Sequence, residues 1–205
     1  FEGLSTYEQH GYVQQTSRAN LSEDIATYYL NKFKAGFSEE QQTGLVLAFT
    51  NAQTNSINQA IREQLKQEGM IGKEDLVKLN GQNFALGDRI VFLKNDKTRL
   101  IITDADGVIQ PEKSIKNGTS GVIQGVNSDG DIIVALKDNL FTLITCNQQI
   151  PKVAIGQPLP EPIREYNYTH IAHGYAVTTH KSQGQTVDFT IVAVSKHMDA
   201  KGLYV

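Results

Sequence analysis

The residues best suited to chemistry form one short run, 176–186, with the sequence AVTTHKSQGQT. The run gathers hydroxyls, an imidazole, an ammonium group and a glycine just before the apolar stretch 189–194 (FTIVAV). Glycine allows backbone N–H groups to approach a phosphate closely, and Thr, His, Lys and Ser side chains can donate hydrogen bonds to a nucleic-acid backbone. A solvated polar loop has the same composition. The run therefore predicts a polar loop at one sheet edge, with phosphate contact as its candidate chemistry.

Two apolar runs are expected to form the sheet that carries this loop. Residues 45–49 (LVLAF) and 189–194 are continuous apolar runs, which is typical of strands buried on both faces of a parallel sheet. A polar segment, 50–54, leads from the first run into an amphipathic helix that ends near Gly69. Another helix is predicted over about 22–34, after an N-cap serine and two first-turn acids. These elements indicate an α/β fold.

The middle of the chain changes to a period of two and predicts an antiparallel barrel. The expected strands are residues 89–93, 121–126, 131–136 and 140–144, with hairpin turns at 127–130 and 137–139. A proline-rich stretch after 150 indicates an exit linker, and 168–176 a short helix. We therefore expect one α/β domain, residues 1–80 and 151–205, interrupted by a small barrel over 81–150.

Composition excludes several classes of protein. A formal net charge of -3 over 205 residues argues against a bulk nucleic-acid binder but allows a local DNA contact. A single cysteine, Cys146, excludes an internal disulfide and a cysteine-rich zinc site. No secretory signal and no apolar run near membrane-spanning length occurs, so we expect a cytoplasmic protein without membrane insertion. No phosphate-loop, zinc-protease or nucleophile-elbow motif is present, and no catalytic residue is predicted within the chain.

Several ordered motifs together resemble a helicase family. Residues 173–186 (HGYAVTTHKSQGQT) resemble motif V of superfamily 1 helicases, specifically the RecD-like branch in conjugative relaxase-helicases of the TraA/TraI type. Residues 45–65 resemble the strand and helix early in the second, C-terminal RecA-like domain of these enzymes. Residues 84–92 (FALGDRIVF) and 116–123 (KNGTSGVI) resemble signatures of the Src-homology-3-like barrel inserted in that domain. The resemblance implies a RecA-like parallel-sheet domain that lacks its phosphate loop and carries this insertion.

The resemblance implies a set of residues that contact DNA. Thr178 and His180 match positions that contact the single-stranded DNA backbone, and Lys181 and Ser182 are their neighbours. Asn51 follows the first strand and is a further candidate. Helix capping is the alternative role of Asn51, because asparagine begins helices routinely.

A second set of residues is implied to face ATP. Gln183 and Gly184 match the nucleotide-facing turn, whereas Thr186 stands where many relatives place a glutamate that contacts the ribose. Arg18 lies roughly where the family places a motif IV arginine that reaches the γ-phosphate, and an ordinary exposed arginine is the alternative. No metal site is expected.

Two weaker groups accompany these candidates. Three tyrosines are suited to base stacking or to a core: Tyr166, Tyr168 and Tyr175. His170 and His173 have a spacing that could place two imidazoles on one helix face, but no third ligand has a suitable spacing for zinc.

The family resemblance implies a function for the longer protein. It would be an ATP-dependent DNA helicase that uses ATP and Mg²⁺ and translocates 5'-to-3' on single-stranded DNA during conjugative plasmid transfer. Its second RecA-like domain would form part of the ATP cleft with the first such domain of the same chain. Because phosphate loop, magnesium carboxylates and arginine finger are missing, we expect the chain alone to bind no cofactor and to be inactive. The alternatives are a docking module recognised by a type IV secretion coupling protein, or part of a RecD-type repair helicase.

Overall fold

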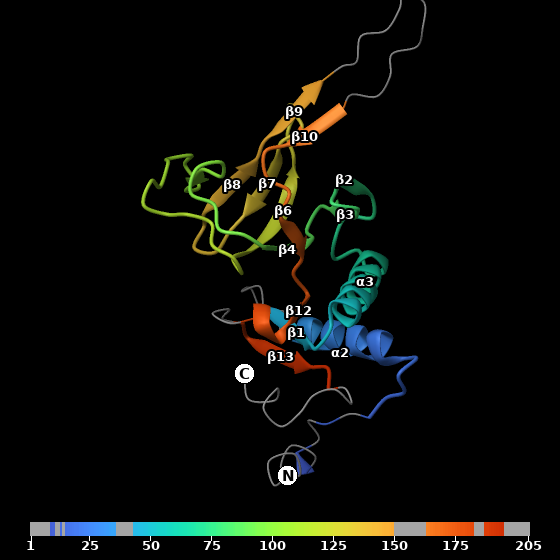
Figure 1. Ribbon diagram of the computed structural model, residues 1–205. Helices are drawn as coiled ribbons and strands as arrows, with labels where there is room; N and C mark the ends of the chain where they lie inside the picture. Colours follow the sequence, from blue (N-terminus) through green and yellow to red (C-terminus); the bar gives the residue numbers. More distant parts are fainter. Residues whose placement is uncertain are drawn as a thin grey trace, which may run out of the picture.

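A computed structural model describes residues 9–10, 13, 15–35, 43–149, 163–182 and 187–194 of the chain. The described elements form an α/β part and an antiparallel part, which lie one above the other in Figure 1. The elements of the α/β part are helices α2 (Leu21–Ala35) and α3 (Asn51–Gln67) and strands β1 (Gly44–Ala48), β12 (Ala176–Thr178) and β13 (Phe189–Val192).

The α/β part is built on a three-stranded parallel sheet in the order β12-β1-β13. Val46 of the central strand pairs with Ala176 on one side and Ile191 on the other. Helices α2 and α3 cover one face of the sheet, where Val46 and Ala48 join a buried cluster with the apolar sides of both helices. The predicted α/β fold with a parallel sheet is confirmed, as are both helices and both strands within one or two residues.

The opposite face of β1 packs against the antiparallel part. Leu45 of β1 and Val177 of β12 form a separate buried cluster with Val91, which belongs to an antiparallel strand. Side chains of successive strand residues point to opposite faces, so β1 is buried on both sides. This contact explains why its sequence is a continuous apolar run rather than an alternating one.

The antiparallel part holds a six-stranded sheet in the order β11-β4-β6-β7-β8-β5 and two hairpin pairs, β2-β3 and β9-β10. Its strands are β2 (Asp75–Leu79), β3 (Gln82–Ala85), β4 (Arg89–Phe92), β5 (Ile102–Thr103), β6 (Ser120–Val126), β7 (Ile132–Ala135), β8 (Phe141–Ile144), β9 (Cys146–Gln149), β10 (Ile163–Tyr166) and β11 (Ile171–His173). All four predicted strands of this region are present. Gly130 and the pair Asp138 and Asn139 adopt positive φ in the two predicted turns.

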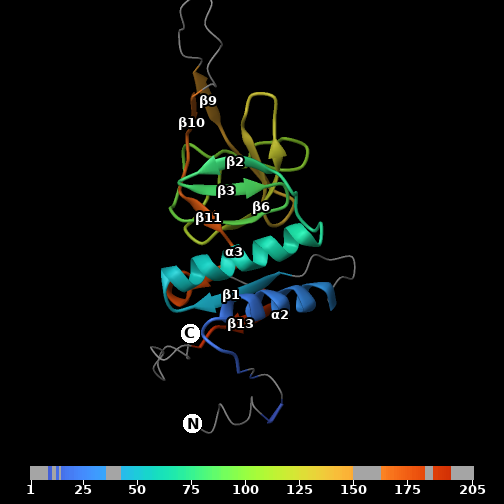
Figure 2. The same cartoon turned by 90° about the vertical axis from the view of Figure 1, so that its right-hand side faces the viewer.

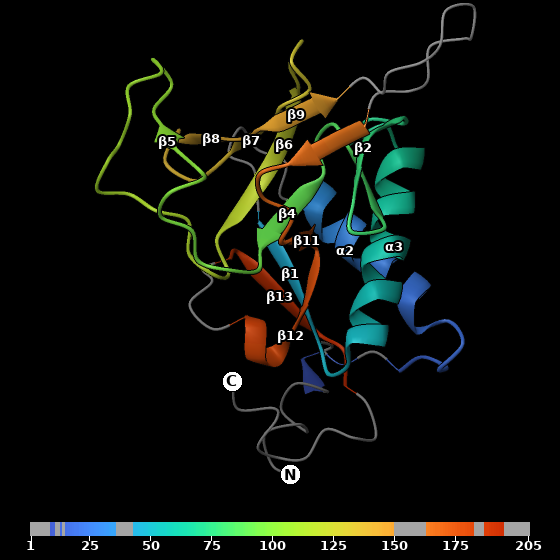
Figure 3. The same ribbon diagram turned by 45° about the horizontal axis from the view of Figure 1, so that its top comes forward.

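The prediction of a short helix over 168–176 is wrong. Ile171 and His173 pair with Phe92 and Ile90 of β4 in an antiparallel ladder, and the chain then passes directly into β12 (Figure 3). The ladder satisfies the backbone groups of this segment better than an isolated helical turn could. Strands β11 and β2 therefore join the antiparallel part although both lie outside the predicted range 81–150. The proline-rich stretch 151–162 lies outside the described residues.

Two negative observations apply to the described part of the chain. None of its helices is long and apolar enough to cross a membrane. Within the same residues, no group of three or more His, Cys, Asp or Glu side chains is placed to hold a metal ion.

The packing of α3 against the sheet gives a stability prediction. Replacing Ile61, which is buried in the cluster between helices and sheet, by alanine should lower the free energy of unfolding by about 2–5 kcal/mol, because apolar contacts are lost and a cavity remains. Urea denaturation followed by circular dichroism measures this loss. The exposed Gln59 of the same helix is the matched control, and its alanine variant should change stability by less than about 0.5 kcal/mol. Equal losses of stability in both variants would contradict the assignment of Ile61 to the buried face of α3 and of Gln59 to its exposed face.

Candidate functional site

The candidate site lies at the carboxyl edge of the parallel sheet. Ala48, the last residue of β1, is the partner of Thr178, the last residue of β12. The segments that follow the two strands therefore emerge side by side, although more than a hundred residues separate them in sequence. Ligands of open α/β sheets bind at such carboxyl ends.

The segment after β1 turns at once into α3. Thr50 is the N-cap of this helix, with its hydroxyl accepting a hydrogen bond from the Gln53 N–H (3.1 Å). Asn51 is the first helical residue and is exposed, so the capping alternative for Asn51 is wrong. Phe49, at the same edge, leaves 39% of its surface exposed. No acidic residue lies in the first turn, so the partial positive charge of the helix N-terminus is not offset locally.

The segment after β12 is a tight turn. Thr178 is half-buried and extended, and residues Thr179–Lys181 form a 3-10 helix, η1. The Ser182 hydroxyl donates to the Thr179 carbonyl (2.7 Å), which closes the turn. Thr179 is buried, whereas Lys181 is exposed. Ser182 thus shapes the turn, in which Thr178 is half-buried and Lys181 is exposed.

The structure brings the predicted DNA-contacting residues to one edge. Asn51 stands on one side of this edge, and Thr178, Lys181 and Ser182 on the other, with the backbone of His180 inside η1. We call these residues together with Phe49 the edge site. The predicted nucleotide-facing residues Gln183 and Gly184 lie outside the described residues.

Arg18 lies at the same end of the α/β part. Ser22 Oγ is 2.8 Å from Ser56 Oγ near the start of both helices, and Lys34 Nζ is 2.6 Å from Glu68 Oε2 near their ends. Helices α2 and α3 therefore run parallel, and Figure 2 shows both beginning where the arrow of β1 points. Arg18 is exposed in the turn before α2, as the alternative of an ordinary exposed arginine also expected.

Asn58 is a positioning residue that sequence reasoning did not find. Its side chain is buried on the apolar face of α3 and clamps the start of β12. The Asn58 Oδ1 accepts from the N–H groups of Tyr175 (3.1 Å) and Ala176 (2.8 Å), and its Nδ2 donates to the Ala176 carbonyl (2.9 Å). The amide thereby satisfies backbone N–H and C=O groups at the start of β12. The sequence offered one signal of this role: Asn58 lies three residues before Ile61, on a helix face that is otherwise apolar.

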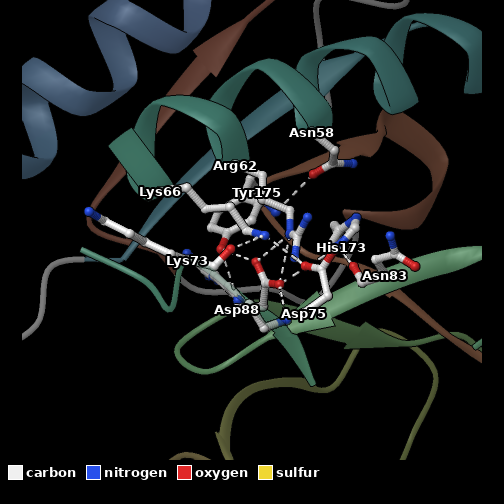
Figure 4. Close-up of polar contacts among 11 residues, drawn as sticks. Asn58, Arg62, Lys66, Lys73, Asp75, Asn83, Asp88, His173 and Tyr175 are labelled. Carbon is white, nitrogen blue, oxygen red and sulfur yellow. Dashed lines mark hydrogen bonds and ion pairs between the residues drawn. The ribbon is translucent and has the colours of Figure 1, made fainter. Parts of the chain in front are cut away.

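Behind the edge site lies a buried charge cluster centred on Asp88 (Figure 4). The Asp88 side chain is 0% exposed, and the Arg62 Nε–H donates to both of its oxygens (2.8 and 3.1 Å). The Ala85 N–H and the Tyr175 hydroxyl complete the shell at 2.6 and 2.9 Å. Arg62 also pairs with Asp75, which in turn receives Lys66 Nζ at 2.7 Å.

The cluster shifts the pKa of its titratable members. Desolvation by burial would lower the pKa of Arg62, but its hydrogen bonds to Asp75 and Asp88 outweigh this effect and raise the pKa. Burial, followed by the negative charge of Asp88, raises the pKa of Tyr175 well above its usual range. The phenol therefore remains protonated and donates to the carboxylate.

His173 borders the cluster as a neutral side chain. Burial lowers the pKa of His173, and the Asp88 carboxylate 4.0 Å away offsets this only in part. The ring Nε2 lies 3.0 Å from the Asn83 carbonyl, so we assign the proton to Nε2. The contact with Asp88 is consequently not an ion pair near neutral pH.

The weaker candidates are accounted for by this packing. Tyr168 and Tyr175 are 1% and 3% exposed, so they belong to the cores and offer no face to a base. The Tyr168 hydroxyl donates to the Lys94 carbonyl (2.7 Å). His173 lies on β11 with its ring nitrogen bonded to Asn83, and His170 precedes that strand rather than sharing a helix with it.

Removal of the central carboxylate should strongly destabilise the protein. We expect Asp88→Ala to lower the free energy of unfolding by about 3–5 kcal/mol, because Arg62, only 13% exposed, loses its buried counter-charge. Urea denaturation measures this loss, with the exposed Asp106 replaced by alanine as control. A loss as small as that of the control would show that Asp88 is not a buried partner.

His173 predicts a pH dependence of stability. The folded state disfavours the protonated imidazole, whereas the unfolded chain has a pKa near 6.5, so the unfolded state binds more protons as the pH falls. The stabilisation is present above about pH 6.5 and is lost as the pH falls through the folded pKa. Unfolding free energies measured from pH 7.5 to 5 should therefore decline, and less steeply in His173→Gln. The same slope in both proteins would refute the assignment.

Comparison with known proteins supports the family indicated by the motifs. No family model matches the chain. The chain is 29% identical over 169 residues to a conjugal transfer protein TraA from Rhizobium radiobacter, covering 82% of this chain and 12% of the relative. It is also 29% identical over 178 residues to a probable TraA of Sinorhizobium fredii strain NGR234, covering 80% of this chain and 13% of that protein.

Matches among solved structures include two Pif1 helicases. A Pif1 helicase from Bacteroides, in complex with ADP-AlF3 and ssDNA, is 18% identical with a TM-score of 0.47, over 93% of this chain and 42% of that chain. Pif1 from Candida albicans is 13% identical with a TM-score of 0.48, over 91% and 49%. Both TM-scores lie below 0.5. The resemblance to TraA-type conjugal transfer proteins that residues 173–186 indicated is confirmed by the sequence relatives, of whose length the chain spans about an eighth.

Proposed function

We propose that the chain is the DNA-contacting part of a conjugative helicase and that it binds single-stranded DNA at the edge site. The observation that carries this proposal is the register of β1 with β12, which places Asn51 beside the turn after Thr178. Similarity to proteins named conjugal transfer protein TraA supports the assignment to conjugation.

The chemistry of the edge site suits a phosphate backbone. The Thr178 hydroxyl and the exposed Lys181 ammonium are donors for phosphate oxygens. The N-terminus of the 17-residue helix α3 adds unpaired N–H groups and a positive partial charge on the other side of the edge. The exposed face of Phe49 offers a surface on which a base can stack without sequence preference. Backbone and base contacts of this kind bind single strands rather than read a sequence.

The motor itself belongs to the longer protein in this proposal. ATP hydrolysis with Mg²⁺ between this part and a first RecA-like domain would drive 5'-to-3' movement along the strand. The exposed guanidinium of Arg18, at the end where both helices begin, fits a contact with a phosphate group presented there. Gln183 and Gly184 are proposed to face the same nucleotide. The antiparallel part is proposed to be a Src-homology-3-like insertion in the second RecA-like domain.

Single-stranded DNA binding tests the proposal directly. The double variant Thr178→Ala/Lys181→Ala should bind a fluorescent oligothymidine about tenfold or more weakly at 50 mM salt, because each substitution removes a phosphate contact. Fluorescence anisotropy measures the affinity, and the dependence of log Kd on log salt should become shallower by about one for the lost lysine.

Lys137 provides a matched control for this experiment. It is exposed in the turn between β7 and β8, on the antiparallel part, and Lys137→Ala removes the same charge without touching the edge site. Its affinity should stay within about twofold of the wild-type value. Equal weakening in Lys137→Ala and in the double variant would indicate non-specific attraction. Retained DNA binding in the double variant would favour the docking-module alternative.

A further inference from the structure

We propose that Asp88 and Tyr175 position the edge site, so that the antiparallel part and the DNA-contacting turn move as one body. The inference rests on the proposed function, because it names the residues that hold the proposed DNA-contacting turn in place. Asp88 and Tyr175 touch neither DNA nor nucleotide in that proposal, and they are therefore positioning residues.

The path between the two parts of the chain is very short. Only Gly174 and Tyr175 separate β11 of the antiparallel sheet from β12 of the parallel sheet. The Gly174 N–H donates to the Arg89 carbonyl of β4 (2.8 Å), and the Tyr175 carbonyl accepts from Val46 of β1 (2.9 Å). A Cβ atom at Gly174 would stand 2.9 Å from the carbonyl carbon of Ile90, so the crossing also lies tightly against β4. The crossing is thus fixed to both sheets.

The Tyr175 hydroxyl extends this attachment into the charge cluster. It donates to Asp88 Oδ1 (2.9 Å) and accepts from the Arg89 N–H (3.2 Å). Both partners belong to the start of β4 or the turn before it. The Arg89 guanidinium in turn donates to the Gly44 carbonyl at the start of β1 (2.6 Å). A shift of β4 must therefore move the amino ends of both β12 and β1.

Helix α3 holds the same crossing from the other side. Asn58 binds the backbone of Tyr175 and Ala176, and Arg62, one turn further along α3, binds Asp88 (Figure 4). The Asp88 carboxylate is thus hydrogen-bonded to α3 through Arg62 and to the start of β12 through Tyr175. The Tyr175–Asp88 bond is buried and the Arg62–Asp88 pair is mostly buried, so water competes little with either contact.

The proposed DNA-contacting turn lies only a few residues beyond this crossing. Strand β12 has three residues, so η1 begins four residues and roughly 13 Å beyond Tyr175 at about 3.3 Å per residue. A short extended strand held at its start transmits a displacement instead of absorbing it. We infer that the turn keeps its DNA-binding geometry only while the Asp88–Tyr175 contact is intact.

The test is Tyr175→Phe, which deletes the hydroxyl and retains the ring. The matched control is Tyr168→Phe, because Tyr168 is equally buried but its hydroxyl bonds only to the Lys94 backbone in the antiparallel part. We expect Tyr175→Phe to weaken oligothymidine binding at least about fivefold at 10 °C, with the folding of both variants checked by circular dichroism, and Tyr168→Phe to leave it unchanged. Amide NMR shifts of residues 178–182 should move in Tyr175→Phe and not in Tyr168→Phe.

The outcomes separate the positioning role from general stability and from the proposed function. Unchanged affinity and unchanged amide shifts in Tyr175→Phe would overturn the inference, as would equal losses in both variants. Asn58→Ala is a second variant that releases the same crossing from the helix side, and it should show the same amide shifts. A wild-type protein that binds no single-stranded DNA would contradict the proposed function alone, since the amide shifts still decide whether Tyr175 positions the turn.

Discussion

The buried carboxylate of Asp88 is the interaction on which the arrangement of this protein depends. It accepts hydrogen bonds from a helix of the α/β part, through Arg62, and from the crossing that starts β12, through Tyr175. It also fixes its own turn through the Ala85 N–H. A buried charge is tolerated only when its oxygens are fully paired, so the three neighbouring elements must meet at one point. Their relative positions follow from this requirement.

Apolar packing surrounds Asp88, but it fixes the relative positions of the elements less precisely than the hydrogen bonds of the carboxylate do. The cluster of Leu45, Val91 and Val177 joins the parallel sheet to β4, while two larger buried clusters form the cores of the α/β part and of the antiparallel part. Apolar contacts are non-directional and permit small sliding of one sheet over the other. The directional bonds of Asp88 select one arrangement among those that the apolar surfaces allow. The edge site inherits its geometry from that choice.

Local patterns in the sequence were sufficient to predict both helices and six of the strands, namely β1, β4, β6, β7, β8 and β13. The continuous run 45–49 predicted a strand buried on both faces, and Leu45 and Val46 indeed join different cores. The helix prediction over 168–176 was wrong because β11 has only three residues, too few to show the period of two that marks a strand. The hairpin of β2 and β3 was missed although Asn80-Gly81, with φ of 47° and 78°, is a strong hairpin signal.

The candidate site was predictable in part. The motif around Thr178 and the segment around Asn51 were both identified, and their meeting at one edge follows from parallel pairing. The Asp88 cluster was not predictable, because Arg62 lies 26 residues away and its charge is typical of any solvated helix face. Asp88 itself was known only as part of a family signature, which says nothing about its partners. Long-range pairing of charges requires the fold.

Photocrosslinking tests the central claim most directly, namely that single-stranded DNA lies on the edge site. An oligothymidine that carries 5-iodouracil would be irradiated in complex with the protein, and the crosslinked peptides would be identified by mass spectrometry. The structure predicts crosslinks at Phe49 and within residues 178–182. Crosslinks confined to the antiparallel strands, for example to β7 and β8, would contradict it.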